Sequence, residues 1–538
     1  MSKNTDSRGL SRRRILQGLG SASIVGLAGC SGNNGDGTTT TDGEDGDGTT
    51  ADDQASEGGK LTLAQVKSPI EFDPIVLNDV PSDEIAQLIY SGLYSYGEGT
   101  DLVPELATGE PSVSNDGTEW TVTLREDATF HNGDQVTPED VRYSFLMPVE
   151  EETENASELN MIDSIDIDGQ DITFNLTYPY GAFLHNLVWS IVPKSVREED
   201  KDAFNTSQPV GSGPFEFVDW TEGDFVTLER WDDYWADDQP NLAEIEFVPV
   251  EEGTTRVTTL RNGDNDVVKE IPPDLWSTVE EMDNASIDSV PGIGYFYLAF
   301  NCMEGPTSDP LVREAVDYTF SMDQAVSNFV EPTGLRQYSP LPRPIAEDWD
   351  MPLDEWEQIP HDKDIDAAKE LFDEAGISMD YQWNIIVPPD DKREQLGVTV
   401  SNGLQEAGFS NVSVQRLDWG TFLDKYVSGD EDDYNMYTLG WSGTPDPDAF
   451  TYFLLARTDD VLGVNNGTFW GEHSEKGVEA AQLFADARES ADREERQQMY
   501  REGITMALED RAHLPAYNLK NSFGVNDYVS DFASHPTD

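Results

Sequence analysis

The pattern of apolar residues changes near residue 303, and this change constrains the fold more than any other feature of the chain. Between about 205 and 300, alternating segments such as "PFEFVDW", "DFVTLERW" and "GYFYLAFN" predict strands. Beyond 303, two helical patterns end on Ala-Gly at Gly376 and Gly408, and a strand pattern follows each. Two successive helix-to-strand units predict a parallel α/β lobe, so we expect at least two folded units.

Capping residues predict where several other elements begin. Residues 60–200 are expected to mix strands and helices, with one helix capped by Ser82 and another capped by Thr137. Asp309, directly before a proline, is expected to start a further helix. A single long helix is predicted over 477–511.

The first thirty residues have the layout of an export signal, with basic residues followed by a short apolar stretch and small residues. "SRRRIL", residues 11–16, resembles the twin-arginine export motif, and "LAGC" resembles a lipobox whose cysteine, Cys30, becomes lipidated. Residues 31–59 contain no large apolar residue, so we expect a disordered, acidic tether rich in Gly and Thr. The sequence thus predicts a lipoprotein anchored through Cys30 to the extracellular face of the cell membrane, with its folded part beginning near Lys60.

Acidic residues dominate the composition, with 106 Asp plus Glu against 33 Lys plus Arg and a formal net charge of −73. They are spread along the whole chain, which disfavours a cation-binding patch and favours a halophilic, haloarchaeal protein whose self-repulsion is screened by salt. No basic face is present to neutralise phosphates, so we expect no nucleic-acid partner. The roughly 480 residues after the tether are too many for one core and predict two or three domains.

The sequence offers no pattern that supports catalysis or metal binding. Its six histidines form no HxH or HxxxH pair, and Cys302 is the only cysteine besides Cys30, so no zinc spacing exists. Walker A, GxGxxG and GxSxG motifs are absent from the sequence. Twelve Trp and nineteen Tyr, several beside turns, suit a cleft that encloses a small ligand, although ordinary core packing accounts for most of them. We therefore expect no enzyme, no cofactor and no metal.

Four segments in order resemble the family 5 extracellular solute-binding proteins, the dipeptide, oligopeptide and nickel-type receptors of ABC importers. These segments are "LREDATFHNGDQVTPEDVRYSF", "VGSGPFEFVDWTEGDFVTLERWDDYW", "YFYLAFNCMEGPTSDPLVREAVDYTFSMDQAV" and "YNMYTLGWSGTPDPDAF". The resemblance extends from about residue 60 to the C-terminus. It implies an α/β, two-lobed periplasmic-binding-protein type II fold, with an extra subdomain in the first lobe and two hinge crossovers that flank the ligand.

The same resemblance implies domain boundaries. The crossovers are expected at 295–301 and 514–520. The first lobe then comprises 60–300 together with 515–538, including an insertion subdomain at about 100–200, and the second lobe comprises 301–514. Closure is expected to be a hinge motion about the crossovers.

One departure from the family concerns the ligand's amino group. In peptide receptors of this family, an aspartate shortly after the Gly-Trp pair holds the ligand's ammonium, and here its place falls at Thr444 or in a short gap. This loss weakens the case for a peptide with a free N-terminus, because a buried ammonium needs a carboxylate partner. The resemblance implies these candidate ligand-binding residues: Trp441 and Tyr338 as stacking walls, Arg336 for a carboxylate, Thr444 and Asp446 after the Gly-Trp pair, and Tyr297 and Asn301 beside the hinge.

The resemblance implies a monomeric receptor that captures a peptide or similar polar organic solute and delivers it to ABC permease subunits. Two other ligands on the same scaffold stay open, an oligosaccharide and a metal chelate, although the missing histidine pair argues against direct nickel ligation. An exported hydrolase and a sensor lipoprotein are the alternatives of another class.

Overall fold

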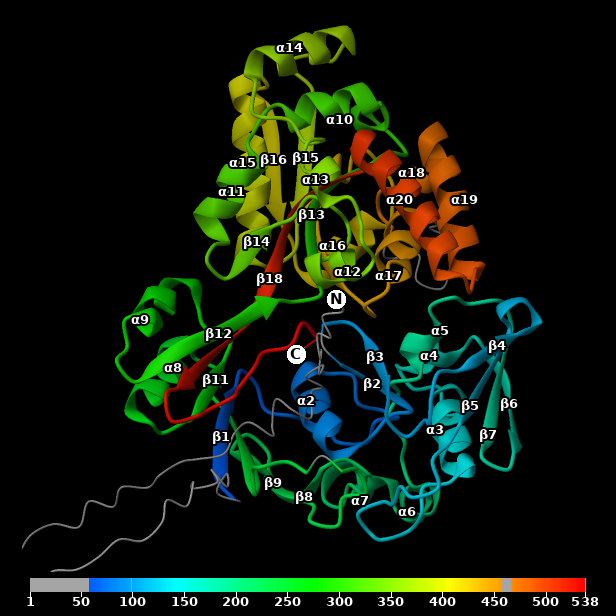
Figure 1. The fold of residues 1–538 in the computed structure, drawn as a ribbon. Helices are drawn as coiled ribbons and strands as arrows, with labels where there is room; N and C mark the ends of the chain where they lie inside the picture. Colours follow the sequence, from blue (N-terminus) through cyan, green and yellow to red (C-terminus); the bar gives the residue numbers. More distant parts are fainter. Residues whose placement is uncertain (1–57, 98, 238, 457–465, 538) are drawn as a thin grey trace, which may run out of the picture.

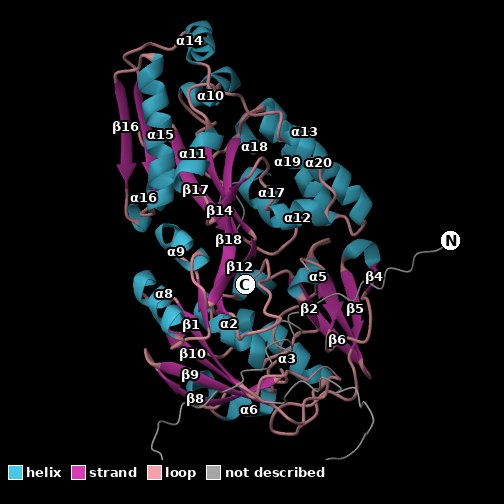
Figure 2. Cartoon of the chain, turned by 60° about the vertical axis from the view of Figure 1, so that its left-hand side comes forward, coloured by secondary structure: helices cyan, strands magenta, loops and turns pink. Residues whose placement is uncertain are grey.

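The computed structural model describes residues 58–537 except 98, 238 and 457–465. The predicted export signal, the lipidation site at Cys30 and nearly all of the tether lie outside the described residues. Figure 1 shows an upper and a lower lobe, and Figure 2 shows strands passing between them. The connecting strands are β12 (Ala285–Pro291), β13 (Gly294–Phe300) and β18 (His513–Asn526).

The first lobe is built on a mixed sheet in the order β11-β1-β10-β9-β8. Its first three strands are parallel to one another, and β9 and β8 extend it as an antiparallel edge. The strands are β1 (Lys60–Gln65), β8 (Phe215–Thr221), β9 (Phe225–Arg230), β10 (Glu244–Pro249) and β11 (Val267–Lys269). The accompanying helices are α2 (Val80–Ile89), α8 (Gly253–Asn262) and α9 (Trp276–Glu280).

An insertion subdomain lies between β1 and β8 and has a core of its own, formed by buried residues between Leu93 and Ile191. Its four-stranded sheet has the order β4-β5-β7-β6, and β2 pairs with β3. The strands are β2 (Tyr94–Tyr96), β3 (Leu102–Pro104), β4 (Ser112–Ser114), β5 (Glu119–Thr123), β6 (Ile162–Asp168) and β7 (Asp171–Leu176). The helices of this region are α3 (Pro138–Glu150), α4 (Ala156–Leu159), α5 (Phe183–Asn186), α6 (Lys194–Glu199) and α7 (Lys201–Thr206).

The second lobe is built on the sheet β16-β15-β17-β13-β18, in which the first three strands are parallel. Strand β13 is antiparallel to both of its neighbours, and β14 pairs with the other edge of β18. The strands not yet given are β14 (Gly334–Arg336), β15 (Gln382–Val387), β16 (Asn411–Arg416) and β17 (Met436–Ser442). The helices are α10 (Pro310–Asp317), α11 (Met322–Phe329), α12 (Arg343–Asp348), α13 (Leu353–Trp356), α14 (Ile365–Glu374), α15 (Asp391–Ala407), α16 (Trp419–Tyr426), α17 (Asp448–Thr451), α18 (Trp470–His473), α19 (Glu475–Glu489) and α20 (Arg493–Glu509), with a π-helical turn, η4 (Tyr452–Ala456).

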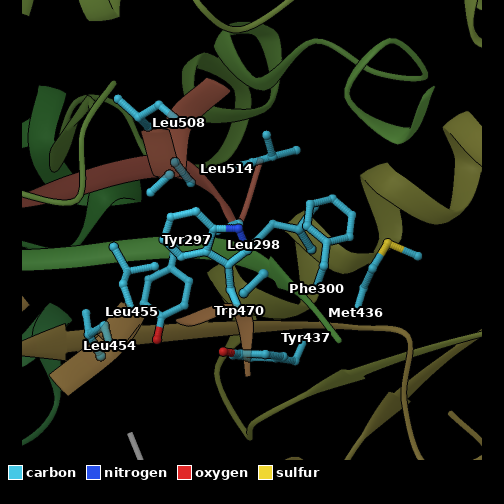
Figure 3. Packing of buried hydrophobic residues seen from close by; sticks show 14 of the residues in the cluster. Tyr297, Leu298, Phe300, Met436, Tyr437, Leu454, Leu455, Trp470, Leu508 and Leu514 are labelled. Carbon is cyan, nitrogen blue, oxygen red and sulfur yellow. The ribbon is translucent and has the colours of Figure 1, made fainter. Parts of the chain in front are cut away.

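Separate cores fill the two lobes. The buried core of the second lobe draws its members from Tyr295 to Tyr517, whereas Phe523 and Val525, farther along β18, pack in the first lobe. Figure 3 shows part of the second-lobe core, with residues of β13 beside Leu454 and Leu455 of η4. Because each lobe buries its own apolar surface, the lobes can move relative to each other without opening either core.

The chain crosses between the lobes at Gly292 and Ile293, between β12 and β13, and within β18. Strand β12 pairs with β18 from Ala285–Asn526 to Pro291–Lys520, and β13 pairs with β18 from Phe296 to Ala299. The sequence predicts a first crossover at 295–301, but residues 294–300 pair with β17 throughout and therefore belong to the second-lobe sheet.

Several local capping signals locate helix ends correctly. Thr137 caps α3 in a reciprocal capping box with Asp140, Asp309 caps α10, and Gly408, at φ 116°, ends α15. The prediction that Ser82 caps α2 is wrong. Asp79 is the cap, because its side chain accepts the Ser82 amide.

The single helix predicted over 477–511 is wrong, because the chain forms α19 and α20. Ser490 adopts an extended backbone, and the side chain of Asp492 accepts the amides of Glu494 and Glu495 to begin α20. The break creates a loop that faces the insertion subdomain.

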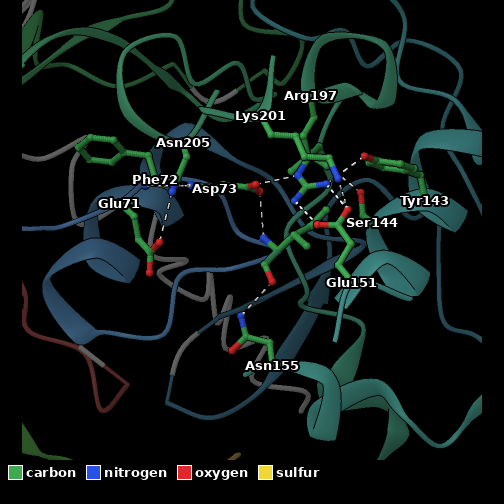
Figure 4. Close-up of polar contacts among 12 residues, drawn as sticks. Glu71, Phe72, Asp73, Tyr143, Ser144, Glu151, Asn155, Arg197, Lys201 and Asn205 are labelled. Carbon is green, nitrogen blue, oxygen red and sulfur yellow. Dashed lines mark hydrogen bonds and ion pairs between the residues drawn. The ribbon is translucent and has the colours of Figure 1, made fainter. Parts of the chain in front are cut away.

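A buried arginine holds the first lobe together around α3 and α6, as Figure 4 shows. Arg197 is 1% exposed and donates from Nε to Asp73 at 2.7 Å. Its Nη1 and Nη2 donate to the two carboxylate oxygens of Glu151 at 2.7 and 2.9 Å, and Nη1 also donates to Tyr143 Oη at 3.0 Å. The hydrogen bonds from Arg197 to Glu151, together with one from Lys201, lower the pKa of Glu151 to about 2. The guanidinium therefore joins three chain segments that are distant in sequence.

Within the described part of the chain, no helix combines the length and the apolar character needed to cross a membrane.

Candidate ligand-binding site between the lobes

The carboxyl ends of the parallel strands in the two lobes face each other. In the second lobe, Gly294, where the chain enters, pairs with Ser442, so β17 ends beside the crossing and its parallel neighbour β15 points in the same direction. In the first lobe, β11 runs antiparallel to β18 and ends at Lys269, opposite Phe523, so β11 and β1 also point toward the crossing. Ligands of open α/β sheets bind at the carboxyl ends of strands. This geometry therefore places the candidate site between the lobes.

The second-lobe edge contains a topological switch point between β15 and β17. The chain leaves β15 for β16 on one side and then returns to β17 on the other. Helix α15 packs over Ile385 and Val387, where a Cβ on Gly397 would lie 2.9 Å from Val387 Cγ1, whereas Tyr426 of α16 packs on Tyr437. Because Ile386 pairs with Tyr437, alternation along the strands puts these two helices on opposite faces of the sheet. Such a point forms a crevice between helices that diverge.

The first-lobe edge holds a closed polar network. Lys269, 7% exposed at the end of β11, forms an ion pair with Glu84 of α2. Gln65, at the end of β1, donates from Nε2 to the other carboxylate oxygen of Glu84 at 2.7 Å. The charges on this edge therefore have partners within the lobe.

The insertion subdomain also contacts the second lobe directly. We call this contact the seam; it consists of residues 178–185 against 486–496 together with Asp446 and Asp448. Gly181 donates its amide to the Arg488 carbonyl at 2.7 Å and accepts from Arg496 Nη1 at 3.0 Å. A Cβ on Gly181 would lie 2.0 Å from the Ser490 carbonyl oxygen, so the backbones approach more closely than a side chain allows.

Two aspartates after the Gly-Trp pair are directed into the seam. Asp446 accepts a hydrogen bond from Arg496 Nη2 at 2.6 Å, and its carboxylate lies 3.9 Å from His185 Nε2. Burial lowers the pKa of His185 to about 4. Asp448 is fully buried, with Arg488 Nη1 3.8 Å from its carboxylate. Burial raises the pKa of Asp448 to about 6, although Arg488 opposes the shift. Asp446, a sequence-predicted ligand contact, is thus engaged by protein partners in this structure.

Trp441 and Thr444 lie at the carboxyl end of β17, where the lobes meet. The Trp441 ring is half-buried and is fixed by a hydrogen bond from Nε1 to the Ala449 carbonyl at 2.7 Å. Thr444 is also half-buried, and its carbonyl accepts the Asp446 amide at 2.7 Å. Of the sequence-predicted residues, these two lie closest along the chain to the opposed strand ends.

Arg336 and Tyr338 lie together at the end of β14, with the guanidinium carbon 4.2 Å from the tyrosine ring centroid. Arg336 donates from Nε to Asp323 at 2.7 Å and from Nη1 to the Pro515 carbonyl at 2.7 Å. Strand β14 is three strand positions from β17, about 14 Å at the usual strand spacing. The structure therefore brings these two residues together but separates them from Trp441.

Tyr297 and Asn301 are both fully buried. Tyr297 stacks on His513 with ring centroids 4.1 Å apart, on the face of β13 that Leu454 and Leu455 cover in Figure 3. Asn301 donates to the Gly429 carbonyl at 2.8 Å and accepts the Met303 amide at 2.9 Å. These side chains, predicted as ligand contacts beside the hinge, contribute to the core and to a turn in this structure.

Arg393 lies in the first turn of α15 at the switch point and is not among the residues predicted from the sequence. One available signal is its place directly after a predicted strand, behind Asp390, which caps the helix by accepting the Arg393 amide at 2.8 Å. Its surroundings come from residues distant in sequence, so the pattern alone does not show them.

Comparison with known proteins identifies the family. The model for bacterial extracellular solute-binding proteins, family 5 Middle, matches residues 101–460. The oligopeptide-binding protein AppA of Bacillus subtilis is 25% identical over 508 residues, covering 89% of this chain and 90% of AppA. The glutathione-binding protein GsiB of Pectobacterium atrosepticum is 26% identical over 452 residues, covering 80% and 83%. The structure of HbpA2 from Haemophilus parasuis superposes with a TM-score of 0.75 at 20% identity, covering 87% and 96%. The chain therefore belongs to the family 5 extracellular solute-binding proteins.

Proposed function

We propose that this chain is the extracytoplasmic substrate-binding component of an ABC importer and encloses a peptide or similar polar organic solute between its lobes. One observation carries the proposal: the carboxyl ends of parallel strands in both lobes face each other across two crossovers. The similarity to the oligopeptide-binding protein AppA and the glutathione-binding protein GsiB supports this ligand class.

The receptor acts by binding and release, without a chemical step. A ligand between the strand ends contacts both lobes at once, so it stabilises a closed arrangement relative to an open one. Gly292 and Ile293, together with the middle of β18, are the segments about which the lobes rotate. The permease then receives the ligand when the lobes open.

A thermal-shift panel tests this proposal on the purified full-length chain in multimolar salt. The panel contains tripeptides, single amino acids, oligosaccharides and metal chelates. A ligand at 100 times its dissociation constant adds about 2.7 kcal/mol of stability, which raises the melting temperature by several degrees. We expect this shift with peptides. A shift only with oligosaccharides or chelates would exclude the peptide class, and turnover of a bound ligand would contradict a receptor.

We also propose that a lipid on Cys30 holds the receptor, as a monomer, at the outer face of the membrane beside its permease. The support is the order of the basic, apolar and lipobox segments in the sequence. Replacing Cys30 with Ser is expected to move the protein from the membrane fraction to the medium. Retention of the Cys30→Ser protein on the membrane would contradict the lipid anchor.

The acidic composition supports a further proposal, that the protein is adapted to very high salt. Lowering the salt concentration is expected to destabilise the fold, because unscreened acidic groups repel one another. A melting temperature that is independent of salt would contradict this adaptation.

A further inference from the structure

The sequence contains six Asn-X-Ser/Thr triplets, the acceptor pattern for N-linked glycans on exported proteins. Their asparagines are Asn155, Asn175, Asn205, Asn284, Asn411 and Asn466. The twin-arginine signal predicted for this chain implies export after folding. A glycosylating enzyme on the outer face of the membrane then meets the folded molecule, so the fold decides which triplets can be modified.

The fold withholds four of these asparagines from an enzyme. Asn175 lies within β7, between β5 and β6, and Asn466 is fully buried. Asn155 and Asn205 are half-buried. Asn155 Nδ2 donates to two backbone carbonyls, at 2.9 and 3.3 Å, and Asn205 Oδ1 accepts two backbone amides, at 2.8 and 3.0 Å. These side chains therefore belong to the internal structure of the first lobe and its insertion subdomain, or to the core of the second lobe.

Asn284 and Asn411 are the exposed asparagines of the six, and their side-chain amides differ in what they hold. Asn284 Nδ2 donates to Asn526 Oδ1 at 3.0 Å, and Asn526 is fully buried. Turning the Asn284 amide outward would leave this buried acceptor with one donor fewer, which is costly. Asn411 Nδ2 donates to the Asp380 carbonyl at 2.9 Å, and Asp380 is exposed, so water can replace this bond at little cost.

The triplet at Asn411 lies on an open edge. Asn411 is the first residue of β16, which pairs only with β15 in the described chain and forms the edge of the second-lobe sheet. Alternation puts Asn411 and Ser413 on one face of the strand, whereas Val412 packs against the core. Both polar side chains of the triplet are thus on the same side of a strand whose outer edge is unpaired in this structure.

This end of β16 points away from the first lobe. Figure 2 shows the arrowhead of β16 directed toward the lower lobe, so Asn411, at the other end of the strand, lies far from the crossing. Its partner Asp380 follows α14, which lies at the outer end of the second lobe in Figure 1. A glycan on Asn411 would therefore stay outside the space between the lobes.

We propose that Asn411 is an N-glycosylation site and that the other five triplets stay unmodified. Asn411 Nδ2 forms a bond to the anomeric carbon of a glycan, and the bond from that carbon to a lipid phosphate breaks. The lipid phosphate leaves, and one amide proton passes to solvent. The donor is a lipid-linked oligosaccharide, used by a membrane glycosyltransferase. The inference goes beyond the proposed receptor function and rests on the proposed export of the chain.

Peptide mapping by mass spectrometry tests this inference on the full-length chain, purified from membranes of the cells that make it. Trypsin cleaves after Lys and Arg, so peptide 394–416 contains the Asn411 triplet and peptide 270–313 contains the Asn284 triplet, each without another triplet. We expect a glycan on peptide 394–416, located by fragmentation at Asn411, and no glycan on the other five triplets. The same chain made in a cytoplasm, without its export signal, should give peptide 394–416 at its unmodified mass.

Variants of the triplet separate the modification from a structural effect. Asn411→Gln and Ser413→Ala should each abolish the glycan, whereas Ser413→Thr, which keeps the acceptor pattern, should retain it. Ser286→Ala is the matched control, because it destroys the Asn284 triplet in the same way and should leave the glycan content unchanged. Melting curves show whether each variant folds, and the map of the unaltered chain decides the question if a variant does not.

The outcomes distinguish this inference from the proposed function. A membrane-bound chain with an unmodified peptide 394–416 overturns the glycan site and leaves the receptor and its location standing. A glycan on any other triplet also overturns it, because the folded surface would not then select the site. A chain confined to the cytoplasm contradicts both the export and the modification. Asn411→Gln should keep the ligand-induced thermal shift of the unaltered chain, and loss of that shift would contradict a site remote from the ligand.

Discussion

Arg496 and Gly181 are 315 residues apart in the sequence, yet Arg496 Nη1 donates to the Gly181 carbonyl at 3.0 Å. Gly181 returns a hydrogen bond from its amide to the Arg488 carbonyl at 2.7 Å. The insertion subdomain is therefore tied to the second lobe independently of the crossover strands. Opening the lobes requires either that the seam break or that the insertion subdomain rotate together with the second lobe.

Gly181→Ala is expected to separate the seam, because the added Cβ would lie 2.0 Å from the Ser490 carbonyl and 3.0 Å from Arg496 Cδ. Hydrogen exchange followed by mass spectrometry should show faster exchange in peptides that cover 180–185 and 488–496. A loss of about 1.4 kcal/mol of local stability corresponds to tenfold faster exchange. Gly109→Ala, in the same subdomain but in open space, is the control. Unchanged exchange at the seam in Gly181→Ala would contradict the close approach.

Asp448 should make the fold less stable as pH rises from about 4 to about 6. Burial raises its pKa from 3.8 to about 6, so the folded state holds a proton that the unfolded state has released in this window. The shift corresponds to about 3 kcal/mol, reached above pH 6. Asp448→Asn removes this term, so the unfolding free energy of the variant relative to wild type should rise by about that amount between pH 4 and 7. A difference that does not change with pH would show that the carboxylate titrates normally.

Arg197→Met should destabilise the first lobe by about 3–5 kcal/mol, because it leaves the carboxylates of Asp73 and Glu151 without their buried cation. Lys201→Gln is the matched control, since Lys201 binds the same Glu151 from a side chain that is 50% exposed. Its loss should cost less than about 1 kcal/mol. Urea denaturation followed by circular dichroism measures both. Equal, small effects would mean that Arg197 contributes little to stability.

Thr444→Asp should restore a preference for ligands with a free ammonium, because it puts a carboxylate where the resemblance places the family's aspartate. Titration should then show unmodified tripeptides binding at least tenfold more tightly than N-acetylated ones, a preference that the wild type is expected to lack. Ser442→Asp, an exposed position two residues earlier, controls for added charge. No gain of preference in Thr444→Asp would mean that this position does not face the ligand's amino end.

Structural features that depend on a few neighbouring residues could be predicted from the sequence. Thr137 and Asp309 begin helices and Gly408 ends one, because each cap is formed within one turn. The break between α19 and α20 was accessible in the same way, through Ser490 and Asp492, but a helical pattern on both sides conceals it.

The site could be predicted only in part, because its surroundings depend on distant contacts. Trp441 and Thr444 lie at a strand end, which alternation and the family pattern both indicate. Tyr297 is also an aromatic residue near a predicted crossover, but its side chain lies on the side of β13 that η4 covers. Nothing near Tyr297 in the sequence reveals this burial. Arg393 lies over the ring of Phe296, which only the folded sheet brings to it.

Strand β18 has a consequence for how the molecule is made. It occupies residues 513–526, after every other helix and strand of the described chain, and it pairs with β13 and β14 in one lobe and with β11 and β12 in the other. Neither sheet can be completed until the ribosome has released this segment. A product terminated before β18 would thus have unpaired strand edges in both lobes, and such edges expose the chain to quality-control proteases.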